Sequence, residues 1–189
     1  MGMLYNSRAI SRREVEEKLK NAGDYVKMDF LSSCLKKEMD FDTKKFVLMK
    51  LAEVYELRRM YYEAAKTIRN AAEINVTFEG KLKDFMKSAE LFVKSGNFDE
   101  SDISFNKALG SAKEIEKVQL KQKRKEWYRA QANDYVLKDK RSHAMSAYEK
   151  LLGLELNPAE KKEVQTALLG LYEKLGKVKE FYALRANMN

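Results

Sequence analysis

The chain has 189 residues, of which 44% are apolar and 35% charged, with one proline and eight glycines. The small number of proline and glycine residues disfavours β-sandwiches and barrels, which need many turns. The large share of apolar residues disfavours collagen-like chains and low-complexity disordered chains. Thirty-seven basic and 29 acidic residues leave a net charge of +8, which suggests nucleic-acid binding, but five successive segments carry 0, +2, +2, +1 and +3 and form no basic block.

The chain is predicted to be helical from residue 12 onward, with residues 1–11 as an N-terminal tail. Ser11 with Glu14, and Ser111 with Glu114, have the spacing of a capping box, in which a hydroxyl and a carboxylate satisfy free N–H groups at a helix start. Asn157 is a further start signal, because a helix-initiating proline follows it. Ten helices are therefore expected, at 12–27, 30–39, 43–58, 60–74, 79–95, 98–110, 112–138, 141–153, 158–175 and 177–187.

Other positions mark the ends of these helices. Asp42 and Asn97 are residue types that cap helix N-termini. Gly96, Gly153 and Gly176 stand where helices could stop, since glycine readily takes the left-handed conformation that ends many helices. No segment shows the period-2 alternation of a strand above this helical background.

Five aromatic residues recur at intervals of 30, 37, 43 and 37 residues, namely Tyr25, Tyr55, Phe92, Tyr135 and Tyr172. Small residues occupy two other columns of this register, in four of five cases each: Ala22, Ala52, Ala89 and Ala132 three residues before the aromatic, and Cys34, Ala64, Ser101 and Ala144 nine residues after it. A small residue lets a second helix approach closely, and the aromatic one turn along fills the angle between the helices. Because one such hairpin cannot bury its apolar face alone, the pattern predicts stacked hairpins.

Three stretches follow the pattern most fully. They carry Leu48, Leu51, Ala52, Tyr55, Ala64, Ile68 and Ala71; then Phe85, Ala89, Phe92, Gly96, Phe98, Phe105 and Ala108; then Tyr128, Ala132, Tyr135, Ala144, Tyr148 and Leu151. These stretches resemble the tetratricopeptide (TPR) repeat family, and the resemblance covers roughly 15–189. It implies an all-α fold, an α-α superhelix (solenoid) of about five TPR-like helical hairpins, in a single domain at 12–189 with degenerate end repeats as caps. The spacing averages about 37 residues rather than the family's 34, which indicates a divergent member.

The resemblance also implies a function. In TPR arrays the first helix of each hairpin lines a concave groove for peptides or partner helices, which implies a non-catalytic adaptor or scaffold that binds another protein. Methionine adapts to varied contacts, although it also fills ordinary cores. A homo-oligomer formed through a degenerate end repeat is a further option. The groove candidates are Met49, Glu53, Met86, Glu90, Arg129 and Asn133, with Glu56, Val93 and Val136 one turn further along.

Arg129 and Asn133 also have the spacing of half a carboxylate clamp, in which a cation and an amide on one helix bind a peptide C-terminus. The other half needs two cations four residues apart on the first helix of the next repeat. Glu163 and Ala167 stand at those positions, so a clamp is disfavoured.

A basic stripe follows one helix face at i, i+4, i+8 and i+12, formed by Lys117, Lys121, Lys125 and Arg129. With Trp127 beside it, the stripe could contact phosphates while the indole stacks on a base. The alternative function is therefore that of an RNA- or ribosome-associated helical protein. The simpler interpretation, a solvated face of a long helix, is favoured over it.

Catalysis and metal binding have little support in the sequence. Cys34 falls in a small-residue column and is expected to be a buried thiol, and His143 has no partner at a recognisable spacing. No phosphate-binding loop and no Cys/His cluster for zinc is found. We therefore expect no enzyme, cofactor or metal site, no membrane segment and a cytoplasmic location.

Overall fold

The structure is a computed structural model that describes residues 9–188. Residues 1–8, most of the predicted tail at 1–11, lie outside the described part, as does residue 189. The all-α prediction is confirmed for residues 9–188, in which no strand occurs. The helices are α1 (Arg12–Leu19), α2 (Asp24–Cys34), α3 (Phe41–Leu57), α4 (Tyr61–Glu73), α5 (Phe78–Lys94), α6 (Phe98–Ser111), α7 (Glu114–Leu137), α8 (Arg141–Leu152), α9 (Pro158–Lys174) and α10 (Val178–Ala186).

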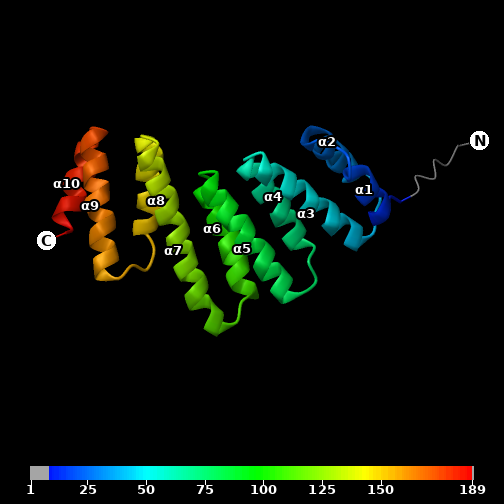
Figure 1. Cartoon of the computed structure of the whole chain (residues 1–189). Helices are drawn as coiled ribbons and strands as arrows, with labels where there is room; N and C mark the ends of the chain where they lie inside the picture. The colour runs from blue at the N-terminus through cyan, green and yellow to red at the C-terminus, as the bar shows by residue number, and fades with distance from the viewer. Residues whose placement is uncertain (1–8, 189) are drawn as a thin grey trace, which may run out of the picture. The chain divides into compact units, whose positions relative to one another are not determined.

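The helices group into two compact units, residues 1–112 with α1 to α6 and residues 113–189 with α7 to α10. Within the first unit, each helix from α2 to α5 packs on the helix that follows it, and within the second unit the same holds from α7 to α9 (Figure 1). The contacts within each unit do not show how many domains the chain forms. A single domain at 12–189 and a superhelix of about five hairpins therefore both stay predictions.

Four helix pairs close with the same backbone turn. In each turn, an aromatic residue near the end of the first helix accepts a hydrogen bond at its carbonyl from the backbone N–H five residues later. The residue just before that N–H has the left-handed conformation. Gly96 (φ 79°) and Gly176 (φ 66°) take this left-handed place, whereas Arg59 (φ 57°) and Asp139 (φ 52°) take it in the other two turns. The bonds run from Met60 to Tyr55 (2.9 Å), Asn97 to Phe92 (2.9 Å), Lys140 to Tyr135 (2.8 Å) and Lys177 to Tyr172 (2.8 Å).

The N-terminal helices depart from the prediction. The expected helices at 12–27 and 30–39 are instead α1, which ends at Leu19, and α2, which ends at Cys34. The break occurs because Gly23 has an extended backbone (ψ 163°) and acts as the N-cap of α2. Tyr25 therefore lies in the first turn of the second helix and is 68% exposed, so its assignment to the aromatic column is wrong.

Two of the predicted helix starts agree with the structure. The N–H of Glu14 donates to Ser11 Oγ (3.4 Å), and the N–H of Glu160 donates to Asn157 Oδ1 (2.8 Å). Each carboxylate also accepts from the backbone N–H of its capping residue, so both capping boxes are complete. Asn97 stands at the N-cap of α6 but makes no capping hydrogen bond with its side chain.

Two other predicted starts are wrong. Asp42 does not cap α3, because Asp40 Oδ1 accepts the Thr43 N–H (2.8 Å), and the hydrogen bonds from Thr43 lower the pKa of Asp40. Ser111 does not begin α7, since it is the last residue of α6. Instead the carboxylate of Glu116 accepts the backbone N–H at the N-cap of α7 (2.8 Å).

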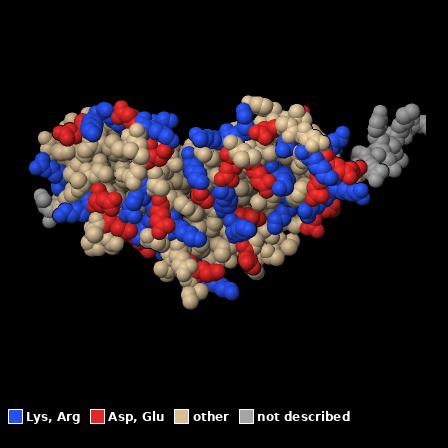
Figure 2. Space-filling view, in the orientation of Figure 1, with Lys and Arg blue, Asp and Glu red and all other residues tan. Residues whose placement is uncertain are grey.

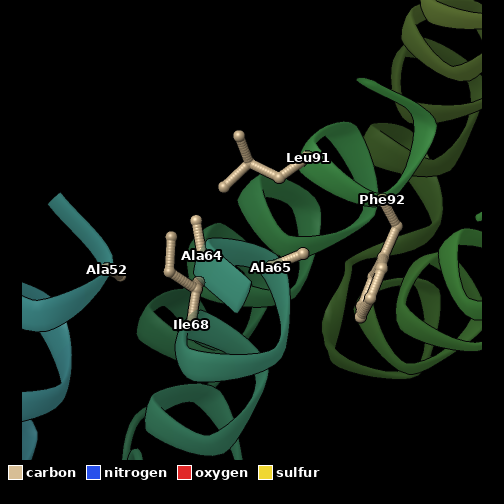
Figure 3. Close-up of a cluster of buried hydrophobic side chains, with 6 residues drawn as sticks. All are labelled: Ala52, Ala64, Ala65, Ile68, Leu91 and Phe92. Carbon is tan, nitrogen blue, oxygen red and sulfur yellow. The ribbon is translucent and has the colours of Figure 1, made fainter. Parts of the chain in front are cut away.

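In the α5–α6 pair the small-residue positions lie where the two helices approach each other, whereas Ala22, in the same column as Ala89, lies outside any helix, between α1 and α2. Ala89 on α5 and Ser101 on α6 are both fully buried, and Ser101 Oγ donates to the Ala89 carbonyl (2.9 Å), which only a close helix pair permits. Phe92 is fully buried and contributes roughly 2–3 kcal/mol of burial free energy. Figure 3 shows the core cluster around it, formed by Ala52, Ala64, Ala65, Ile68, Leu91 and Phe92.

Candidate protein-binding surface

Two residues assigned to a groove on α5 are part of the core instead. Met86 is 8% exposed and Val93 is 1% exposed, so neither is available to a partner. The prediction is wrong because α5 packs against both α4 and α6. Two packed neighbours bury more of a helix surface than the single apolar face that the prediction assumed.

The candidates on α3 lie nearer the surface. Met49 is half-buried, whereas Glu53 is exposed and pairs with Lys50 one turn earlier (2.8 Å). Glu56 pairs with Lys87 of α5 (2.7 Å), so its charge is used between helices. The carboxylate of Glu53 is thus held only by the exposed ion pair with Lys50. Such exposed pairs rearrange at little cost, so among the α3 candidates Glu53 is the most available to a partner.

Glu90 on α5 is bound to its own helix. Its carboxylate lies 2.6 Å from Lys94 Nζ, one turn further along. Burial lowers the pKa of Lys94, but the hydrogen bond and the charge of Glu90 outweigh burial and leave that pKa above its usual value. A partner that displaced Lys94 would have to replace this interaction.

The half-clamp on α7 is occupied by the chain's own side chains. Arg129 Nη2 lies 3.6 Å from Glu160 Oε1 and 3.7 Å from Glu163 Oε2 on α9. Asn133 Oδ1 accepts a hydrogen bond from the Tyr148 hydroxyl of α8 (2.6 Å). Asn133 is therefore hydrogen-bonded within the second unit. Within residues 9–188 the buried Nη2 of Arg129 has no hydrogen-bond partner, so its contact with the two glutamates, which a peptide carboxylate would have to displace, is only electrostatic.

The basic stripe is also matched by carboxylates. All four of its cations lie within 4 Å of a glutamate, so their charge is largely neutralised inside the second unit. Hydrogen bonds from Asn157 and then from Lys125 lower the pKa of Glu160, which keeps that carboxylate ionised. The pairs are Lys117 with Glu114 (2.5 Å), Lys121 with Glu155 (3.2 Å), Lys125 with Glu160 (3.1 Å), and Arg129 with Glu160 and Glu163.

Many of these ion pairs join residues about one repeat apart. Their sequence separations are 31 to 35 residues. Four of the pairs link corresponding helices of consecutive helix pairs, and Lys121 of α7 pairs with Glu155 in the connection before α9. A scan for opposite charges at the repeat spacing would have found them in the sequence. Figure 2 accordingly shows basic and acidic side chains interspersed on the visible face. The pairs are Glu56–Lys87, Arg69–Glu100, Glu73–Lys107, Lys121–Glu155 and Lys125–Glu160.

An open pocket of about 590 Å³ lies between α1, α2 and α3. Its apolar lining includes Leu31, which is fully buried, and Leu57, which is 76% exposed at the end of α3. Phe46 is covered on its ring by two cations, Arg12 at 4.4 Å and Lys50 at 5.9 Å from the centroid. The pocket is lined by Arg12, Glu16, Leu19, Lys20, Asp24, Lys27, Leu31, Phe46, Lys50, Glu53, Val54 and Leu57.

Of the predicted groove residues, Glu53 lines this pocket. Phe46, Lys50 and Leu57 were missed, although Phe46, Lys50, Glu53 and Leu57 recur at intervals of four, three and four residues along one face of α3. That spacing was a usable signal. What the sequence could not show is that the break at Gly23 places α2 beside this face.

The residues considered for chemistry are dispersed. Cys34 is buried, and burial raises the pKa of its thiol, which makes it a poor nucleophile. His143 lies against the ring of Tyr135, with 5.2 Å between the centroids. No group of His, Cys, Asp and Glu suited to a metal ion occurs in residues 9–188. Among the helices described, none is long and apolar enough to cross a membrane.

No family model matches the chain, and no curated protein matches it. A similar solved structure is the crystal structure of BtubC (BKLC) from P. vanneervenii, which is 17% identical in sequence. The match covers 93% of this chain and 78% of that chain, with a TM-score of 0.38. A likeness this weak supports neither a fold family nor a function for this chain.

Proposed function

We propose that the protein is a non-catalytic adaptor that binds another protein in the pocket between α1, α2 and α3. The observation that carries the proposal is the exposure of Leu57, 76%, at the mouth of a pocket of about 590 Å³ whose floor includes buried Leu31. Apolar side chains that converge on a concave, charge-rimmed surface are typical of places where a partner inserts an anchor side chain.

The proposal extends the predicted fold. The four matching turns and the repeat-spaced ion pairs support a TPR-like α-α superhelix of hairpins, with α1 and α2 as its degenerate first repeat. A degenerate end repeat leaves part of its neighbour's surface uncovered, which is how an interhelical pocket arises there. A cytoplasmic location is part of the proposal, since the single cysteine forms no disulfide.

The ion pairs favour a protein partner over RNA. Two cations of the basic stripe, Lys125 and Arg129, are mostly buried in ion pairs with Glu160. A nucleic acid would have to break these pairs and would meet the repulsion of the neighbouring carboxylates. Phosphate binding depends on cations that are free to replace condensed counterions.

The test is affinity purification from the native cell with and without nuclease, using the full chain and two variants. Leu57→Asp places a charge in the pocket, and Val76→Asp is its matched control, because Val76 is 80% exposed in the same unit and does not line the pocket. We expect a retained protein that survives nuclease and Val76→Asp but is lost with Leu57→Asp. Retention that nuclease abolishes, or that Leu57→Asp leaves intact, would refute the proposal.

A further inference from the structure

The rim of the α1–α2–α3 pocket has an uneven charge balance. Four cations and three carboxylates line the pocket. Two of the carboxylates are already engaged, Glu16 by Arg12 (2.8 Å) and Glu53 by Lys50 (2.8 Å). The charged side chains of the rim that form neither of these two ion pairs are the ones available to a partner.

Those remaining charges are Lys20, Lys27 and Asp24. Within residues 9–188 none of the three forms an ion pair with another side chain. Asp24 lies in the first turn of α2, where the helix dipole stabilises a carboxylate. Lys20 is the C-cap residue of α1 and Lys27 lies one turn into α2. The rim therefore presents two ammonium groups against one carboxylate that its own helix end already stabilises.

The aromatic part of the lining disfavours a basic partner. Arg12 and Lys50 both lie over the ring of Phe46, at 4.4 Å and 5.9 Å from its centroid. A lysine or arginine from a partner would find this ring already occupied by the two cations on it. Exposed Leu57 and half-buried Leu19 are left for an apolar side chain.

We propose that the pocket binds an acidic segment of a partner protein, in which one large apolar side chain is flanked by aspartate or glutamate. The apolar side chain packs on exposed Leu57 and half-buried Leu19, and the carboxylates face Lys20 and Lys27. This inference rests on the proposed function and specifies the chemistry of the partner at the same site. Rim charges of this kind act mainly on the association rate and on the choice of partner.

The experiment selects ligands from a random peptide library displayed on phage, with the full chain as target. Enriched peptides are synthesised with a fluorescent label and titrated by anisotropy. The test variant is the double charge reversal Lys20→Glu with Lys27→Glu. Its matched control is Lys36→Glu with Lys37→Glu, which makes the same charge change at exposed positions of the same unit outside the pocket.

We expect enriched peptides with an excess of acidic residues around a leucine or phenylalanine. Their affinity should fall roughly tenfold in the test variant and little in the control. It should also fall as the ionic strength rises. Circular dichroism of both variants should match that of the unmodified chain.

Several outcomes would overturn the inference. One is that no peptide is enriched, and another is that enriched peptides lack acidic residues or bind the test variant unchanged. If Leu57→Asp abolishes binding while the charge reversal does not, the proposed function stands and the acidic partner is refuted. If the chain alone is a dimer that Leu57→Asp dissociates, a second copy occupies the pocket and the inference is wrong.

Discussion

Replacing Arg59 by glycine should stabilise the protein. Arg59 occupies the left-handed place in the turn between α3 and α4 (φ 57°), which Gly96 and Gly176 occupy in two equivalent turns. Its side chain is exposed, and within residues 9–188 it forms no hydrogen bond or ion pair that the substitution would remove. The change therefore alters backbone energetics almost alone.

The size of the effect follows from two opposing terms. A side-chain-bearing residue in the left-handed conformation costs roughly 1–2 kcal/mol, which Arg59→Gly relieves. Glycine makes the unfolded chain more flexible, which costs about 0.4–1 kcal/mol. The net gain in the free energy of unfolding is about 0.5–1 kcal/mol, or about 1–4 °C in melting temperature for a chain of this length.

Two alanine substitutions calibrate the assay, which is thermal and urea unfolding followed by circular dichroism. Gly176→Ala should destabilise by a similar amount, because Gly176 has φ 66° although a Cβ there would meet no atom within 4 Å. Gly153→Ala should be neutral or slightly stabilising, because Gly153 has φ −72° and a Cβ there makes only ordinary contacts.

The reasoning would be refuted if Arg59→Gly lowered the midpoint while Gly176→Ala did the same. That result would mean that loss of a side chain at position 59 matters more than the backbone conformation, and that the turns are not equivalent. A neutral Gly176→Ala would show instead that the left-handed conformation is not retained at that turn.

Two further predictions concern buried and charged contacts. Gly80→Ala should lower the free energy of unfolding in urea by about 1–3 kcal/mol, because a Cβ there would overlap the Asn75 carboxamide. That carboxamide is held in place, since its Nδ2 donates a hydrogen bond to Asp84 Oδ2 (2.9 Å). Gly110→Ala is the control and should not destabilise, because a Cβ at Gly110 would meet no atom within 4 Å. Since the folded-state pKa of Glu160 is lowered from 4.5, its contribution to stability is present above that pH and is lost as the pH falls through the folded-state value. Glu160→Gln should therefore reduce stability at neutral pH and flatten the acid-induced loss, and an equally steep loss in the variant would contradict this.

Much of the helical pattern could be predicted from local residue chemistry. The capping boxes at Ser11 and Asn157 and the glycine at position 96 act within a few residues of themselves, so a linear pattern shows them directly. The predicted helix at 12–27 was wrong because the helix-forming residues around Gly23 were given more weight than the local preference of Gly23 for a break.

The candidate site could be predicted only in part. Glu53 was found because it lies on an exposed face of one helix, but Met86 was misassigned, because its burial depends on two other helices that cover α5. The basic stripe shows the same limit, since the four cations are visible in the sequence, whereas their glutamates lie up to 35 residues away.

The sequence by itself determined that this protein is built of helices and where the turns between four helix pairs lie, because capping, glycine conformation and helical periodicity are local properties. Only the tertiary structure decided which charged faces are neutralised and which apolar face is left open beside α1 and α2. Both depend on side chains from helices distant in sequence, and distance in space sets the strength of electrostatic and packing interactions.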